Sequence, residues 1–204
     1  MAKPKRTRIQ REKREVILNA GLQVFSENGF RGTTLDQIAE VAGLSKPNML
    51  YYFPNKEEIY TNILQDILEV WFIPLEEINE SGDPLDQIRA YIRAKMEMSR
   101  KYPQQSRMFA NEILHGAPRI ATEIVDQLNS IVDKKVAIIE RWIAAGKIAD
   151  VNPHHLLFAV WATTQHYADF AVQIDGVLRG SDEDPIATGT NFLEGLFMRG
   201  LAPK

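Results

Sequence analysis

Helical periodicity along almost the whole chain limits the fold more than any other feature. Apolar residues recur at intervals of three and four, and no stretch alternates in the manner of a half-buried strand. Proline stands where one helical pattern gives way to the next, as at Asp83-Pro84, Tyr102-Pro103 and Asn152-Pro153, and proline is favoured in a first helical turn. The sequence therefore predicts an all-α protein of about nine helices.

Three helices are expected near the N-terminus, over 10–28, 35–42 and 45–53. Gly29 suits the left-handed conformation that ends a helix. Thr34 and Gln37 have the spacing of a capping box, and Ser45 is a suitable N-cap for the third helix. Two short helices joined by a tight turn at Gly43 predict a helix-turn-helix.

The remaining chain has the pattern of an antiparallel helical bundle. A long helix is expected over 55–80, with Pro74 inside it. Proline removes one backbone hydrogen bond and clashes with the preceding turn, so a kink is expected there. A last helix is expected over 184–201. These helices are long enough to bury a common core.

Charge is distributed unevenly along the chain. Ten Lys and Arg stand against five acids through Lys56, a net charge of +5, whereas the whole chain carries −3 and the rest therefore −8. A basic N-terminal unit of this kind favours a polyanionic partner. A solubilising tail is the alternative, since seven of the ten positive charges lie in the first 14 residues.

Several classes of protein are excluded by what the sequence lacks. Cysteine is absent, which excludes a disulfide scaffold, a thiol nucleophile and cysteine-ligated zinc. The adjacent His154 and His155 point about 100° apart on a helix and cannot bind one ion together. No phosphate-binding loop, nucleophile elbow or long apolar run is present. We expect a cytoplasmic protein that is not an enzyme and has no metal, cofactor or membrane partner.

The third predicted helix carries the side chains suited to reading DNA. Residues near the N-terminus of a recognition helix meet base edges in the major groove. Lys46 can donate to guanine and Asn48 can pair with adenine, whereas Pro47 and Tyr51 suit thymine methyl groups and sugars. Double-stranded DNA is the expected partner.

Three further residues are expected to bind phosphates. Thr34 and Lys56 stand at helix N-termini, which favour anions, and Tyr52 offers a hydroxyl donor nearby. Such contacts set the register of a protein on DNA without reading its sequence. Each residue has a plainer alternative role: Thr34 as a helix cap, Tyr52 in the core, and Lys56 as a solvated side chain.

The segment from Gly32 to Tyr60 resembles the DNA-binding domain of TetR-family transcriptional regulators. Gly43-Leu44-Ser45, Phe53 and Lys56 match the pattern of that family. Leu50 stands where the family usually has tyrosine. The resemblance implies a homodimer with a helical ligand domain, whose binding to an operator is switched by a small molecule. We therefore expect a disordered basic arm, a helix-turn-helix DNA-binding domain and a ligand-binding and dimerisation domain, over residues 1–9, 10–54 and 55–204.

Most of the chain is similar to a narrower group, the regulators of pyrimidine utilisation. The residues that carry this resemblance are YYFPNKEEIY, YPQQSRMF, HGAP and TQHYADF, at 51–60, 102–109, 115–118 and 164–170. The resemblance implies uracil or thymine as the effector. The alternatives are a regulator of the same type that answers to another small molecule, an effector-free DNA-binding module, and a helical enzyme with a basic tip.

A polar and aromatic stretch late in the chain is the predicted effector site. Trp161, Thr164 and Gln165 share one helix face. A glutamine amide offers both a donor and an acceptor, as a planar imide ring requires, and an indole can stack on such a ring. The further candidates for this site are Trp71, Phe72, Arg107 and Asn111. A dimer interface is the alternative for residues 164–170, because aromatic residues are enriched at interfaces.

Overall fold

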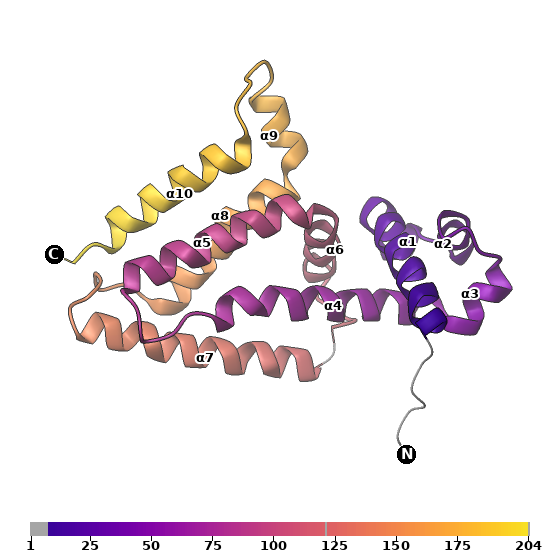
Figure 1. The fold of residues 1–204 in the computed structure, drawn as a ribbon, viewed down its shortest axis with the longest axis horizontal. Coiled ribbons are helices and arrows are strands. Elements are labelled where there is room, and N and C mark those ends of the chain that lie inside the picture. The colour runs from indigo at the N-terminus through magenta and orange to yellow at the C-terminus, as the bar shows by residue number, and fades with distance from the viewer. Residues whose placement is uncertain (1–7, 121, 204) are drawn as a thin grey trace. The chain divides into compact units, whose positions relative to one another are not determined.

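The computed structural model describes residues 8–120 and 122–203, and over these it is built of helices without any strand (Figure 1). The all-α prediction is confirmed. The helices are α1 (Arg8–Gly32), α2 (Leu35–Val41), α3 (Lys46–Tyr52), α4 (Lys56–Glu76), α5 (Pro84–Lys101), α6 (Pro103–Leu114), α7 (Thr122–Ala144), α8 (Pro153–Asp169), α9 (Ala171–Val177) and α10 (Pro185–Leu201).

Helix boundaries differ from the prediction in three places. The described residues hold ten helices rather than nine, because Phe170, at φ −115° and ψ 28°, separates α9 from α8. Helix α1 resumes for one short stretch after Gly29, whose φ is 66°. Helix α4 ends at Glu76, and the ammonium of Lys135 binds the carbonyls of Glu76 and Ile78 there. Residues 1–7 of the expected arm lie outside the described residues, and α1 already includes Arg8.

The chain divides into two compact units. The first joins residues up to Leu68 with 107–120, and the second joins 69–106 with the residues after Ile120. Helices α4 and α6 therefore each begin in one unit and end in the other. The expected domain limits stay a prediction, because compactness alone does not establish where a functional domain begins.

In the first unit, helices α1, α2 and α3 pack around a small apolar core. Phe25, Ile38, Met49 and Phe53 are almost completely buried there. The approach of α1 to α4 is close at Gly21, where a Cβ atom would stand 2.7 Å from Cγ2 of Ile59. A core of this kind holds the two short helices in place even though neither is long enough to be stable alone.

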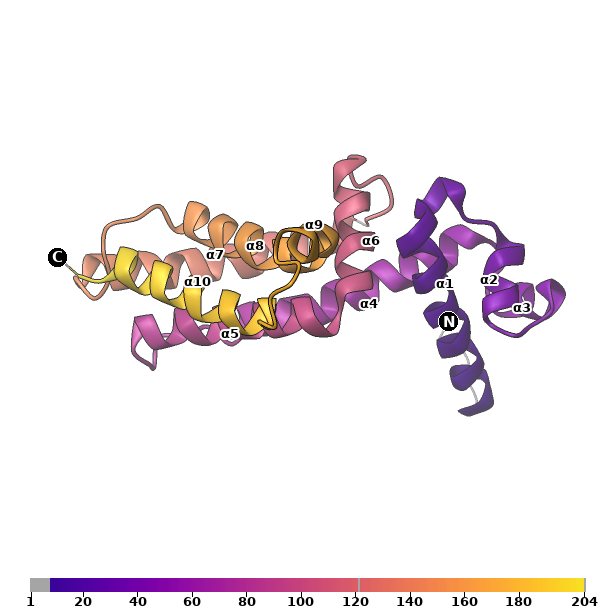
Figure 2. The same ribbon diagram turned by 90° about the horizontal axis from the view of Figure 1, so that it is seen from above.

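In the second unit, α5 lies beside both α8 and α10 (Figure 2). Each of these helices begins with a side-chain cap followed by proline: Asp83, Asn152 and Asp184 accept backbone N–H groups. The core contains Ile92, Met96, Leu157 and other apolar residues. No helix in the described ranges combines the length and apolar composition that crossing a bilayer requires.

Candidate DNA-contacting surface and effector cavity

The turn between α2 and α3 has the capping that the sequence predicts. The N–H of Gln37 donates to Oγ1 of Thr34 at 3.3 Å, and the N–H of Thr34 donates to Oε1 of Gln37 at 2.8 Å. Ser45 caps α3 by accepting the N–H of Asn48 at 3.4 Å. Gly43, at φ 62°, makes the turn between the helices. These contacts determine which face of α3 is exposed.

The structure places the predicted base-reading residues together on that exposed face. Lys46, Pro47, Asn48 and Tyr51 are all exposed, whereas Met49 between them is completely buried. Nζ of Lys46 lies 2.8 Å from Oδ2 of Asp36. An exposed ion pair of this kind contributes little free energy, so Lys46 can exchange this partner for DNA.

The end of α3 is held by α1. The guanidinium of Arg14 donates to the carbonyl oxygen of Tyr52 at 2.7 Å and to Oδ1 of Asn62 at 3.1 Å. It also lies 3.8 Å from the centroid of the Phe53 ring. The side chain of Tyr52 is half-buried. The bond from Arg14 fixes its backbone at the end of α3. The sequence gives no sign of this role of Arg14, because its partners are 38 and 48 residues away.

Lys56 binds the link between α1 and α2. Its ammonium donates to the carbonyl oxygens of Phe30 and Thr33, each at 2.7 Å, and lies 4.5 Å from the centroid of the Phe30 ring. Burial, and next the nearby charge of Arg119, lower the pKa of Lys56. An ammonium has three N–H donors, so the predicted phosphate contact remains compatible with these two bonds.

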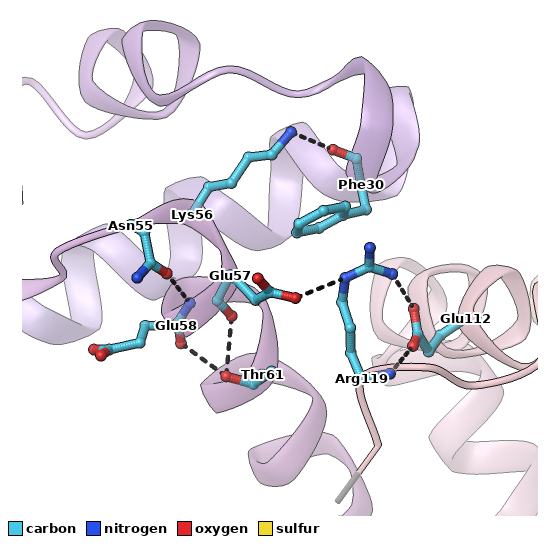
Figure 3. A network of polar contacts seen from close by, with 8 residues as sticks. All are labelled: Phe30, Asn55, Lys56, Glu57, Glu58, Thr61, Glu112 and Arg119. Atoms are coloured by element: carbon cyan, nitrogen blue, oxygen red, sulfur yellow. Dashed lines mark hydrogen bonds and ion pairs between the residues drawn. The ribbon is translucent and has the colours of Figure 1, made fainter.

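A second cation reaches Phe30 from the segment after α6 (Figure 3). The guanidinium of Arg119 lies 3.6 Å from the centroid of the Phe30 ring. It pairs with Glu112 and Glu57, with closest N–O distances of 3.5 Å in both cases. The backbone N–H of Arg119 donates to Oε1 of Glu112 at 2.7 Å. We refer to Phe30, Tyr60, Glu112 and Arg119 as the Arg119 cluster.

The second unit contains a small cavity of about 10 Å³, which is room for about one water molecule. The residues that line it are Trp71, Lys95, Met98, Ser99, Ser106 and Gln165. Trp71 and Gln165 belong to the predicted effector site. Lys95 and the two serines were missed, because in sequence they are ordinary polar residues of amphipathic helices.

The structure does not bring the other predicted effector residues to this cavity. The indole N–H of Trp161 donates to the hydroxyl of Tyr91 at 2.6 Å, and the hydroxyl of Thr164 donates to the carbonyl oxygen of Val160 at 2.7 Å. Phe72 is a core residue. Arg107 and Asn111 belong to the first unit. Helical spacing shows which residues share a face but not which neighbour that face meets.

Lys95 is the most unusual side chain at the cavity. It is 5% exposed, and its ammonium lies 5.0 Å from the centroid of the Trp71 ring. Burial lowers its pKa from 10.5 to about 8, and the nearby carboxylate of Asp169 acts in the opposite direction. Asp169 accepts the hydroxyl of Ser106 at 2.5 Å. Buried lysines are rare without such a partner.

Helices α8 and α10 also expose several large apolar side chains. Phe158 on α8 and Phe192 and Leu196 on α10 are among the exposed large apolar residues of the described chain. A groove of about 290 Å³ lies between the start of α8 and the end of α10, and Leu156 and Leu196 are part of its lining. Exposed apolar side chains that gather on adjacent helices favour a surface that another molecule covers.

Two protein-family models match this chain, one over each part. Residues 17–63 match the family model described as bacterial regulatory proteins, tetR family, and residues 64–204 match the model described as YcdC-like protein, C-terminal region. The chain is 48% identical over 182 residues to the HTH-type transcriptional regulator RutR of Escherichia coli K12, covering 89% of this chain and 86% of RutR.

Two solved structures have the same fold. The ketosteroid transcriptional regulator KstR2 of Mycobacterium tuberculosis has a TM-score of 0.76 at 22% identity, covering 94% of this chain and 96% of KstR2. AibR in complex with isovaleryl coenzyme A and operator DNA has a TM-score of 0.70 at 16% identity, covering 90% of this chain and 97% of AibR.

Proposed function

Because the chain belongs to the TetR family of bacterial transcriptional regulators, we propose that it is a homodimer whose affinity for its operator changes when uracil or thymine binds. Like the relatives that it matches, it is a DNA-binding regulator and not an enzyme. The observation that carries the proposal is a small cavity with Trp71 and Gln165 in its wall, in a unit separate from the helix-turn-helix.

The operator contacts follow from the exposed face of α3. We propose that Lys46, Asn48 and Tyr51 meet base edges and that the helix N-termini at Thr34 and Lys56 bind phosphates. The full proposed set is Thr34, Lys46, Pro47, Asn48, Tyr51, Tyr52 and Lys56. A regulator that acts on genomic DNA in a bacterium works in the cytoplasm, which is the proposed location.

The apolar surface of α8 and α10 is the proposed dimer interface. Phe158, Phe192 and Leu196 are large apolar side chains on two adjacent helices, and a second copy of the chain would bury them around a twofold axis. A dimer presents two copies of α3, and each would read one half-site of the operator.

The effector site is proposed at the cavity. Trp71 offers an indole for stacking and Gln165 offers both a donor and an acceptor. Helix α4 carries Lys56 in its first turn and Trp71 fifteen residues later, so one element links the operator side to the effector side. Trp161, Thr164, Phe72, Arg107 and Asn111 remain candidates for residues that respond to the ligand at a distance.

Uracil and thymine are expected to change operator affinity at least about fivefold, the lower end of typical allosteric coupling. The measurement is fluorescence anisotropy with a DNA site that the protein selects from a random pool. Adenine serves as the control ligand. If neither pyrimidine changes the affinity while another metabolite does, the chain is a regulator of the same family for a different small molecule.

Asn48→Ala is expected to relax base preference at one operator position by about 1–3 kcal/mol, since a bidentate amide–adenine contact contributes that much discrimination. Lys56→Ala is the comparison and is expected to weaken all DNA about equally. Binding to the selected site and to its single-base variants measures both effects. If Asn48→Ala lowered the affinity for every DNA sequence equally, the assignment of Asn48 to base reading would be wrong.

A further inference from the structure

The side chain of Arg14 extends from α1 to the C-terminal end of the reading helix α3. We infer that Arg14 is a positioning residue for operator recognition: it holds α3 in the orientation in which its exposed face distinguishes the operator from other DNA. This inference rests on the proposed function, because it concerns the operator contacts of α3. It adds a specificity-determining residue that lies on neither helix of the helix-turn-helix.

Helix α3 depends on support from outside because it is short. It has seven residues, and an isolated helix of this length is unstable in water. The hydroxyl of Ser45 caps its first turn. Its last turn contains no basic residue, although a positive charge at the C-terminal end stabilises a helix. The guanidinium of Arg14 brings that charge from α1 and binds a carbonyl oxygen at this end.

The guanidinium of Arg14 binds two helices at once. Nη1 donates to the carbonyl oxygen of Tyr52 on α3, and Nη2 donates to Oδ1 of Asn62 on α4. The amide of Asn62 is itself oriented, since its Nδ2 donates to the carbonyl oxygen of Glu58 at 2.7 Å. A guanidinium is planar and its N–H groups have fixed directions. The end of α3 is therefore held at a defined position relative to both α1 and α4.

The ring of Phe53 restricts the guanidinium further. Phe53 follows α3 directly and is completely buried, and the guanidinium lies over the face of its ring. A cation in this position is attracted by the ring. Arg14 is thus held by two hydrogen bonds and by one aromatic contact, all with residues of the first unit.

The carbonyl that Arg14 binds belongs to the residue next to a reading side chain. The rings of Tyr51 and Tyr52 meet edge to face with their centroids 5.1 Å apart, and Tyr51 is 74% exposed. Lys46 and Asn48 lie on the same short helix, so a tilt of α3 would displace all the reading side chains together. Hydrogen bonds to base edges weaken steeply with small displacements, whereas the attraction of phosphates for cations changes slowly with distance. A tilt of α3 would therefore reduce specific binding more than non-specific binding.

Arg14→Met tests the inference, because methionine can still pack on Phe53 but cannot donate a hydrogen bond. Anisotropy gives the affinity of the full-length protein for the selected operator and for a scrambled sequence of the same length, and the ratio of the two is the readout. Arg14→Met is expected to lower this ratio at least about tenfold, the discrimination that one bidentate base contact provides. An unfolded fraction lowers both affinities equally, so a loss of stability alone leaves the ratio unchanged.

Lys13→Met is the matched control, since it removes the same charge from an exposed position on α1. It is expected to keep the wild-type ratio. Asn62→Leu removes only the contact with α4 and is expected to lower the ratio. Arg14→Met/Asn62→Leu should lower it no further than Arg14→Met does, because both residues act through one contact. A wild-type ratio in Asn62→Leu, or effects that multiply in the double variant, would contradict the link to α4.

An unchanged ratio in Arg14→Met overturns the inference. If Arg14→Met instead weakens binding to both DNAs equally and the slope of log affinity against log salt becomes shallower by about 0.9, Arg14 binds a phosphate and does not position α3. A wild-type protein that binds both DNAs equally would contradict the proposed function and this inference with it. A wild-type protein that discriminates, together with an Arg14→Met variant that discriminates as well, would contradict the inference alone.

Discussion

Replacing both Phe158 and Leu196 by glutamate is expected to convert the proposed dimer into a monomer that binds the operator at least about 100-fold more weakly. Two linked reading helices gain about 10² to 10⁴ in affinity over one, because the second half-site is bound at a high effective concentration. The two side chains lie on α8 and α10, are 49% and 46% exposed, and would be desolvated between copies. Like charges facing each other across a twofold axis would oppose association.

Sedimentation measures the mass of this variant, and anisotropy measures its operator affinity. Val125→Glu on α7, where the side chain is 43% exposed, is the control, and it is expected to remain dimeric. Circular dichroism should show that both variants keep their helices. If the double variant stays dimeric and binds the operator normally, the dimer interface does not lie on α8 and α10.

Glu112→Ala is expected to lower the free energy of unfolding of the first unit by about 3 kcal/mol, since removing the buried partner of Arg119 leaves its guanidinium with only the exposed Glu57 as counter-charge. Glu112 is 2% exposed. It accepts the backbone N–H of Arg119 at 2.7 Å and binds the hydroxyl of Tyr60, whose pKa is raised chiefly by burial and further by this carboxylate. Alanine would leave these donors without an acceptor.

Glu57→Ala provides the matched comparison, because Glu57 pairs with the same guanidinium at the same 3.5 Å but its side chain is 63% exposed. Its loss is expected to be below about 1 kcal/mol. All three tryptophans lie in the second unit, so their fluorescence follows that unit while circular dichroism follows both. In Glu112→Ala, part of the dichroism should be lost at lower urea than the fluorescence change. Equal stability of the two variants would show that the Arg119 cluster does not hold the first unit together.

Local signals in the sequence predicted helix starts well. Thr34, Ser45, Asp83 and Asn152 each cap a helix in the structure, because a cap involves residues two or three positions apart. The break between α8 and α9 at Phe170 was not predicted, since no proline or glycine stands at that position. The exposed face of α3 was also predictable, because the burial of Met49 leaves its neighbours outside.

The lining of the cavity in the second unit could not be predicted from the sequence. Trp161 and Gln165 are four residues apart on α8, yet the indole of Trp161 meets Tyr91 while Gln165 lines the cavity. The functional candidates found only in the structure, Lys95 and Arg119, depend on partners from other helices.

The sequence by itself determined the class of fold, the helix-turn-helix with the exposed face of α3, and the separation of a basic N-terminal part from an acidic body. Those properties depend on periodicity, capping and charge, which act between residues close in the chain. Only the tertiary structure decided which charged side chains meet partners from other helices, as with Lys95 beside Trp71 and Arg119 between Glu112 and Glu57. Burial and long-range pairing depend on how helices pack, and periodicity within one helix does not specify its neighbour.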